Sequence, residues 1–187
     1  MKGFVGDDHL KIYNQTLNTL LTSISTHFSI PTNHANEDSG SSLLHHTAPT
    51  FFTLLVGEEG WEAASEHDVY WTRHVDRNNT NHYHYSALLY LSTYNKDFGD
   101  GGTFHIFDEH NLDKEEWEVE VRRGRTLLFS SGVENPHQVT KIGWGERLVL
   151  SLWFTCDLNK IMELKLDRSP HFEFKKPDSE EILKDEL

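Results

Sequence analysis

The sequence predicts a mainly β fold, the double-stranded β-helix or jelly roll, with flanking N-terminal and short C-terminal helices. Between Phe51 and Thr155, short runs of β-branched and aromatic residues alternate with turn residues. Two of these runs, residues 86–91 and 148–154, are apolar almost throughout, which is typical of strands covered on both faces. We therefore expect these two strands to lie in the centre of a sheet.

The remaining elements follow in order along the chain. Residues 8–27 carry apolar residues at helical spacing and predict one amphipathic helix. Residues 29–50 are rich in Pro, Asn, Ser, Gly, His and Thr, which indicates a loop with the pair His45–His46 on its surface. Apolar residues spaced after Cys156 permit a short helix. Eight strands are expected over residues 51–56, 69–74, 83–91, 102–107, 117–121, 125–129, 137–142 and 147–155.

The length of 187 residues, with 36% hydrophobic and 12% aromatic residues, fits one globular unit with a core of ordinary size. Within it we expect residues 1–50 to form a helix and loop that pack on the core. Residues 51–156 should form the jelly-roll core, and residues 157–187 a short helix and a charged tail. Cys156, the only cysteine, excludes an intrachain disulfide and is expected to be a small buried side chain.

The net charge of −13 disfavours a nucleic-acid partner, because proteins that bind nucleic acids usually present a basic surface to the phosphates. An acidic surface suits a neutral or basic protein or peptide substrate, although it also serves simply to keep a protein soluble. No apolar stretch approaches the length of a membrane span.

The chain ends in Lys184–Leu187, the Lys-Asp-Glu-Leu address for retention in the endoplasmic reticulum, which favours that compartment. The first eight residues contain no apolar stretch of signal-peptide length. We therefore expect a fragment, or an isoform without an upstream signal or anchor. Two Asn-x-Thr triplets, at Asn14 and Asn78, would be glycosylation acceptors in that compartment, but such triplets are common and leave the question open.

The most informative pattern is His74-Val75-Asp76, followed by His137 and, ten residues later, Arg147. Two imidazoles and one carboxylate can occupy one face of a six-coordinate ferrous ion and leave three positions open. We expect His74 to close the second strand, Asp76 to begin the following loop, and His137 and Arg147 to open the last two strands. In a jelly roll these strand ends can converge, and Arg147 could then hold the far carboxylate of a co-substrate with its planar fork.

A second His-x-acid fragment, at His171 and Glu173, serves as an internal control. Such fragments are common in a chain with 13 His and 30 acidic residues. No later His follows His171 as a third ligand, and the surrounding segment has the composition of a charged tail. Only His74 is accompanied by the residues that a ferrous site requires.

Several segments together resemble the prolyl hydroxylase superfamily of 2-oxoglutarate- and Fe(II)-dependent dioxygenases. The resemblance is strongest to the procollagen prolyl 3-hydroxylase branch and to related oxygenase-domain proteins. It covers about half of the chain, from Val69 to Cys156. The segments that carry it are residues 73–78, 84–92, 97–104, 124–125 and 129–139.

The resemblance implies roles for particular residues. The family's catalytic metal triad falls on His74, Asp76 and His137. Its 2-oxoglutarate-binding residues fall on Arg147 and Tyr90. The implied reaction couples decarboxylation of 2-oxoglutarate to succinate with hydroxylation of a protein side chain, with proline as the first candidate. The implied cofactors are Fe(II), 2-oxoglutarate as co-substrate, and ascorbate.

Two departures from the family weaken the assignment of a substrate. Relatives often supply another co-substrate tyrosine before the first metal ligand, and here only Tyr70 lies in that region. The large substrate-recognition domains of the procollagen enzymes have no counterpart in this chain. A non-catalytic jelly-roll scaffold therefore stays open as an alternative, and so does a zinc or manganese cupin-like enzyme. Succinate release and metal identity distinguish these alternatives.

Overall fold

The computed structural model describes residues 7–33, 41–47, 50–65, 69–111 and 114–161. The chain forms two compact units, residues 1–19 with 163–187, and residues 20–162. In the first unit the described residues, 7–19, are all helical. The expected charged tail and the terminal tetrapeptide lie outside the described residues, and the division at residues 50 and 156 stays a prediction.

Helix α1 spans Asp7–His27 and confirms the helix expected over residues 8–27. In its C-terminal part, Leu20 and Ile24 are 4% and 0% exposed, so the apolar stripe predicted by the spacing is buried there. In the described part of the chain, no helix combines the length and the hydrophobicity needed to cross a membrane.

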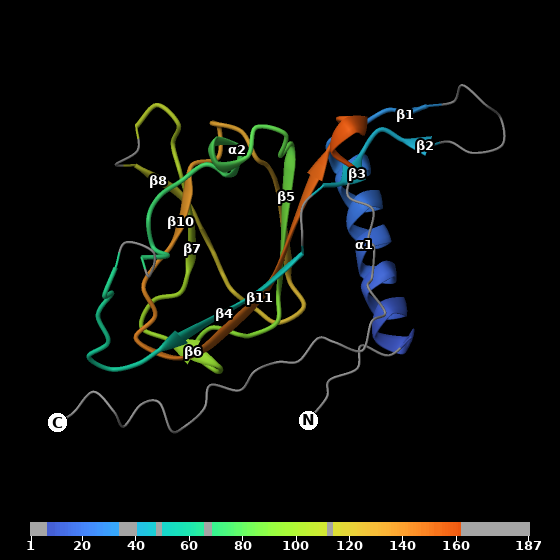
Figure 1. The fold of residues 1–187 in the computed structure, drawn as a ribbon. Coiled ribbons are helices and arrows are strands. Elements are labelled where there is room, and N and C mark those ends of the chain that lie inside the picture. The colour runs from blue at the N-terminus through green and yellow to red at the C-terminus, as the bar shows by residue number, and fades with distance from the viewer. Residues whose placement is uncertain (1–6, 34–40, 48–49, 66–68, 112–113, 162–187) are drawn as a thin grey trace. The chain divides into compact units, whose positions relative to one another are not determined.

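The second unit is built on antiparallel strands, which confirms the mainly β, jelly-roll class (Figure 1). A three-stranded sheet has the order β10-β7-β8, and a larger sheet has the order β3-β11-β5-β9 with β4 and β6 also paired to β11. The strand bounds are β3 His45–His46, β4 Phe51–Gly57, β5 Tyr85–Tyr90, β6 Phe98–Gly99, β7 Phe104–Phe107, β8 Glu115–Val119, β9 Thr126–Ser130, β10 His137–Val139 and β11 Trp144–Thr155. A separate pair joins β1 Thr32–Asn33 to β2 Ser41–Ser42.

The two nearly continuous apolar runs form β5 and β11, and both lie inside the larger sheet, as predicted. In their pairing Val149 lies opposite Tyr90. Because side chains alternate along a strand, Arg147 points to the same face of β11 as Val149 and thus lies diagonally from Tyr90. A buried cluster surrounds this position and contains Tyr90, Phe98, Val121, Ile142 and Val149.

The expected strand over residues 69–74 is wrong. Only His74 pairs there, in one isolated bridge to His137. The aromatic residues that suggested a strand pack on one another instead: the Trp71 ring lies 5.0 Å from Tyr70 and 6.2 Å from Trp61, centroid to centroid. Asp76 was expected in a loop, and it begins the short helix α2, Asp76–Asn79.

Two expectations about which residues are exposed and which are buried are also wrong. His45–His46 forms β3 rather than a loop, since it pairs with the end of β11, and His46 is 6% exposed. Its ring packs edge-on against Phe154, with ring centroids 6.1 Å apart. Conversely, β11 ends at Thr155, so Cys156 falls outside the sheet and is exposed. The short helix expected next is a single 3-10 turn, Leu158–Lys160.

The strand expected from residue 102 begins at Phe104, because the preceding residues form a turn. Gly101 and Gly102 have φ of 103° and 79°, in the left-handed region that favours glycine. A Cβ on Gly101 would also collide with the carbonyl oxygen of Lys141. The turn therefore requires glycine at this position for two independent reasons.

Candidate metal centre

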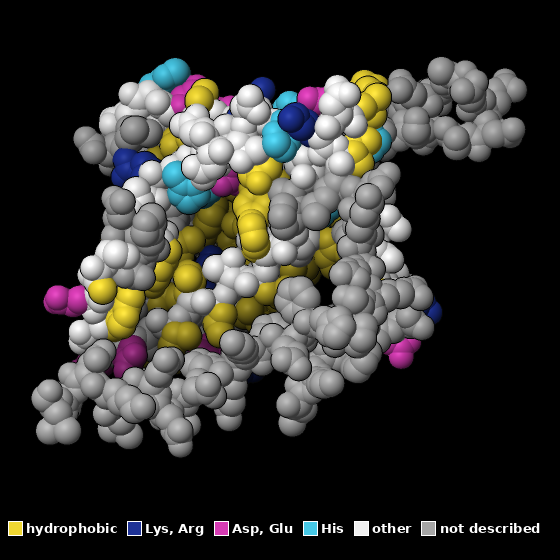
Figure 2. Space-filling model, in the orientation of Figure 1, with side chains coloured by type: hydrophobic (Ala, Val, Ile, Leu, Met, Phe, Trp, Pro, Cys, Tyr) yellow, Lys and Arg dark blue, Asp and Glu magenta, His cyan; other side chains and the backbone are white. Residues whose placement is uncertain are grey.

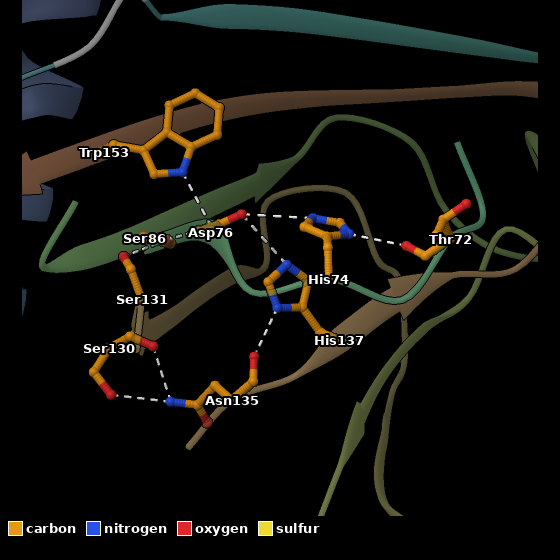
Figure 3. Close-up of polar contacts among 9 residues, drawn as sticks. All are labelled: Thr72, His74, Asp76, Ser86, Ser130, Ser131, Asn135, His137 and Trp153. Atoms are coloured by element: carbon orange, nitrogen blue, oxygen red, sulfur yellow. Dashed lines mark hydrogen bonds and ion pairs between the residues drawn. The ribbon is translucent and has the colours of Figure 1, made fainter. Parts of the chain in front are cut away.

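The bridge between His74 and His137 sets the position of both histidines. Each backbone N–H donates to the other residue's carbonyl at 2.9 Å. Residues directly opposite in an antiparallel pair project to the same face, and the two imidazole centroids lie 4.4 Å apart. Asp76, at the start of α2, brings its carboxylate to the same point (Figure 3).

The three side chains are close enough to share one ion. Oδ1 of Asp76 lies 3.5 Å from Nε2 of His74 and 3.6 Å from Nε2 of His137. All three ligand atoms lie within 4.8 Å of one another. The donor set of two imidazoles and one carboxylate is that of the facial triad of non-haem iron oxygenases. The structure thus brings together the three metal ligands that the sequence predicted.

Backbone carbonyls fix the tautomer of each imidazole. Nδ1 of His74 lies 2.9 Å from the carbonyl oxygen of Thr72, and Nδ1 of His137 lies 2.9 Å from that of Asn135. Because a carbonyl oxygen only accepts hydrogen bonds, each Nδ1 must carry the proton. Nε2 of both rings is then the nitrogen that faces Asp76 Oδ1 and would bind a metal ion.

The Asp76 carboxylate is held from its other oxygen. Oδ2 accepts hydrogen bonds from Ser86 Oγ at 2.6 Å and from Trp153 Nε1 at 3.1 Å. Burial acts to raise the pKa of Asp76, but in the metal-free protein its interactions with the imidazoles of His137 and His74 and the hydrogen bond from Ser86 outweigh burial and hold the pKa well below its usual range. The nearby Asp76 carboxylate in turn raises the pKa of the His74 imidazole. Asp76 is therefore a charged ligand.

Arg147 and Tyr90 form a second polar group in the core. Their exposed fractions are 3% and 0%, and the Arg147 Cζ lies 5.5 Å from the Tyr90 ring centroid. Among the described residues, Nε and Nη2 of Arg147 and Oη of Tyr90 have no hydrogen-bond partner. Burial lowers the pKa of Arg147 and raises that of Tyr90 to about 12. Buried donors of this kind are costly unless paired, so they fit a ligand that carries a carboxylate.

Tyr70, whose role the sequence left open, also reaches this group. Its hydroxyl oxygen accepts a hydrogen bond from the Ile142 N–H at 2.9 Å. Its electrostatic interaction with Arg147 acts to raise the pKa of the guanidinium, against the effect of burial. The loop before the first ligand thus contributes a tyrosine on the side of Arg147.

A cavity of about 420 Å³ opens beside the metal ligand His74. A larger cavity, of about 680 Å³, contains none of the triad residues and neither Arg147 nor Tyr90. In the view of Figure 2, the surface of the molecule has a hollow that is lined by hydrophobic side chains. The cavity beside His74 is lined by Arg73, His74, Val75, Asn78, Pro136 and Gln138.

Sequence reasoning missed the residues that support the ligands. Ser86 on β5 and Trp153 on β11 bond to Asp76, and Ser131, just after β9, bonds to Ser86; no local pattern marks these residues. Asn135 anchors the segment before His137, because its side-chain amide donates to the carbonyl and hydroxyl oxygens of Ser130, both at 2.9 Å.

Residues 62–155 match the family model of the 2OG-Fe(II) oxygenase superfamily. The chain is similar to 2-oxoglutarate and iron-dependent oxygenase domain-containing protein 3 of Xenopus tropicalis, with 36% identity over 157 residues, 84% of this chain and 44% of the relative. It is also similar to human prolyl 3-hydroxylase 1, with 48% identity over 73 residues, 39% of this chain and 9% of that protein. The chain thus spans less than half the length of these relatives.

A solved structure shows the same fold at lower identity. It is a prolyl hydroxylase from Trichoplax adhaerens in complex with a peptide fragment of the hypoxia inducible factor oxygen degradation domain. The match has a TM-score of 0.51 and 19% identity, and it covers 82% of this chain and 59% of that chain. With the triad intact and half of its residues matched by the family model, the chain belongs to the 2OG-Fe(II) oxygenase superfamily.

Proposed function

We propose that the protein hydroxylates the side chain of a polypeptide, with proline as the first residue to test. The observation that carries the proposal is the pairing of an intact triad with the unpaired buried donors of Arg147 and Tyr90. When bound, Fe(II) and 2-oxoglutarate would supply the oxidising chemistry with dioxygen as the oxidant: one oxygen atom would enter succinate as 2-oxoglutarate loses carbon dioxide, and the other would enter a C–H bond of the substrate.

One group of residues binds the metal, and a second group binds the co-substrate. Nε2 of His74, Nε2 of His137 and Oδ1 of Asp76 would hold the metal, and three ligands would leave three positions of a six-coordinate ion open. Arg147 and Tyr90 bind the far carboxylate of 2-oxoglutarate and thereby orient it. The Asp76 carboxylate fills the position that related halogenases leave vacant for chloride, which favours hydroxylation. No side chain has to act as an acid or base, because the cofactor carries the chemistry.

A polypeptide substrate is supported by the cavity beside His74 and by the relatives. Arg73, Asn78 and Gln138 give this cavity side chains that can bind backbone amides and carbonyls. The guanidinium of Arg73 lies over the Phe107 ring, 3.8 Å from its centroid, and this contact holds it in place. The net charge of −13 favours a neutral or basic peptide over a nucleic acid. Two of the relatives described above are named as prolyl hydroxylases.

The test is a peptide screen with two readouts. The purified protein, with Fe(II), 2-oxoglutarate and ascorbate, is incubated with proline-containing peptides of different charge. We expect succinate release together with the gain of one oxygen atom by a peptide, and neither with the Asp76→Ala variant. Succinate release with oxygen transfer only to residues other than proline would overturn the prolyl assignment. Peptide binding without succinate release would support the scaffold alternative.

We also propose two conditions of the reaction that the sequence suggests. Ascorbate should prolong turnover, which is measured by omitting it from the succinate assay. The Lys184–Leu187 tetrapeptide favours the lumen of the endoplasmic reticulum. Loss of lumenal retention when these residues are deleted from the expressed protein would support this compartment, and an unchanged distribution would contradict it.

A further inference from the structure

The metal ligand Asp76 is connected to a pair of buried serines. We propose that Ser131 and Ser86 form a two-hydroxyl relay that, together with Trp153, reserves Oδ1 of Asp76 for the metal. Ser131 touches none of the three metal ligands' donor atoms and acts through Ser86, so it is a positioning residue. The inference rests on the metal centre described above and assigns the residues that give its carboxylate one fixed orientation.

The direction of the relay is set by proton counting. Ser86 Oγ lies 2.6 Å from Asp76 Oδ2 and 2.7 Å from Ser131 Oγ. A carboxylate only accepts hydrogen bonds, so the single hydroxyl proton of Ser86 goes to Asp76. The hydroxyl of Ser131 must then donate to Ser86. Both serines are 1% exposed, so bulk water has little access to these hydroxyls, and the low local dielectric strengthens each bond.

The backbone holds Ser131 in place from both sides. Its N–H donates to the carbonyl of His84, and its carbonyl accepts from the N–H of Arg77, both at 2.9 Å. His84 precedes β5, and Arg77 is the second residue of α2, which begins with Asp76. Ser131 therefore ties the helix that carries the ligand to the strand that carries Ser86.

Trp153 completes the set from the neighbouring strand. It lies directly opposite Ser86 in the pairing of β11 with β5. Its indole ring stacks on Tyr83 at a centroid distance of 5.2 Å and an interplanar angle of 19°, and meets the edge of Phe51 at 5.6 Å. These contacts fix the orientation of the indole ring, so that its N–H points at Oδ2 of Asp76.

The two oxygens of Asp76 consequently have different tasks. Oδ2 accepts from Ser86 and Trp153, whereas Oδ1 faces Nε2 of both histidines at 3.5 and 3.6 Å. Binding of a metal through both oxygens would break two buried hydrogen bonds to a charged group, which are the stronger kind. The relay would thus favour binding of a metal through Oδ1 alone. The coordination position that Oδ2 would otherwise take would then stay available to co-substrate or dioxygen.

The test measures the affinity of the metal-free protein for Co²⁺ by calorimetry and records the visible spectrum of the Co²⁺ complex. Loss of a partner of a metal ligand typically costs about 10–100-fold in metal affinity. We expect Ser86→Ala to lie near the upper end of that range and Ser131→Ala near the lower end. A changed Co²⁺ spectrum in both variants would report the altered carboxylate coordination. Ser86→Thr, which keeps the hydroxyl, should restore most of the affinity.

The double variant separates a relay from a general structural effect. Because Ser131 acts only through the Ser86 hydroxyl, adding Ser131→Ala to Ser86→Ala should change the Co²⁺ affinity by less than about twofold. Ser92→Ala is the matched control. Ser92 is also buried, at 3% exposure, but its hydroxyl bonds to the backbone of Leu148. The Ser92→Ala variant should keep the Co²⁺ affinity and the Co²⁺ spectrum of the wild type.

The outcomes are distinguishable. Failure of the wild-type protein to bind Co²⁺ would refute the metal centre itself. Wild-type binding with an unchanged affinity in Ser131→Ala, or losses in the two serine variants that simply add, would refute the relay. If an alanine variant does not fold, as judged by thermal unfolding without metal, the corresponding cysteine variant carries the same test. It keeps the side-chain volume with only a weak donor, so weaker Co²⁺ binding is expected and unchanged binding would overturn the proposal.

Discussion

Replacing Arg147 by methionine should make the metal-free protein more stable and at the same time remove its response to 2-oxoglutarate. Arg147 is 3% exposed, no carboxylate among the described residues pairs with it, and Nε and Nη2 have no hydrogen-bond partner there. A buried cation without a partner opposes folding, whereas a methionine of similar length fills the same space. The Arg147 side chain therefore favours binding of 2-oxoglutarate and lowers the free energy of unfolding of the ligand-free protein.

The expected magnitudes come from these contacts. Two charge-assisted hydrogen bonds at about 1.5–3 kcal/mol each give about 3–6 kcal/mol, which corresponds to a loss of about 10²–10⁴-fold in 2-oxoglutarate affinity. For the metal-free protein, exchanging buried ionic groups for well-packed apolar ones is often stabilising by about 1–4 kcal/mol. We expect Arg147→Met to raise the free energy of unfolding within that range.

Both effects can be measured by unfolding. The free energy of unfolding is first compared without metal. Both proteins are then loaded with Mn²⁺ and titrated with 2-oxoglutarate. At a concentration 100 times its wild-type Kd, the ligand should stabilise the wild type by about 2.7 kcal/mol and Arg147→Met by at most about 0.4 kcal/mol. Arg122→Met is the control, since Arg122 forms an exposed ion pair with Glu120 and should change neither quantity by more than about 1 kcal/mol.

Two results would refute this reasoning. Equal stabilisation of both proteins by 2-oxoglutarate would show that Arg147 does not bind the co-substrate. A metal-free Arg147→Met protein that is less stable than the wild type would show that the guanidinium is already compensated within the fold. The two results are independent, so each part of the argument can fail by itself.

The remaining predictions concern other parts of the site and fold. His137→Ala should abolish iron-dependent turnover with an unchanged far-ultraviolet dichroism spectrum, and persisting turnover would contradict the triad. Tyr90→Phe should weaken 2-oxoglutarate binding by about tenfold at little cost in stability, because the hydroxyl has no partner among the described residues. Since burial raises the pKa of Tyr90 to about 12, its neutral hydroxyl persists and this difference should stay constant up to a pH of about 10, as calorimetry would show. Gly101→Ala should lower the free energy of unfolding by about 1–3 kcal/mol in denaturant melts, and clearly more than Gly124→Ala, where the added Cβ meets no atom within 4 Å.

The metal ligands could be predicted from the sequence because the pattern itself is local. His74 and Asp76 are two residues apart, and His137 and Arg147 follow in the order and at the spacing that the family resemblance implies. The two central strands could also be predicted, since burial on both faces leaves an almost continuous apolar run in β5 and β11.

The supporting residues could not be predicted, because they meet only through strand pairing. Ser86, Ser131 and Trp153 converge on Asp76 only when β5 pairs with both β9 and β11. The wrong strand at residues 69–74 has a related cause. Its aromatic residues have high β propensity, but the pairing of Tyr70 and Trp71 with nearby rings decides their conformation instead.

The most direct test of the metal centre and its co-substrate is the anaerobic addition of Fe²⁺ and 2-oxoglutarate to the purified protein. A chelate of the two at the triad should give a visible charge-transfer band in the wild type, and His137→Ala should lose it while remaining folded. This result would establish a competent centre built on His74, Asp76 and His137. A folded wild-type protein that shows no band at saturating Fe²⁺ and 2-oxoglutarate would contradict the assignment of an oxygenase centre.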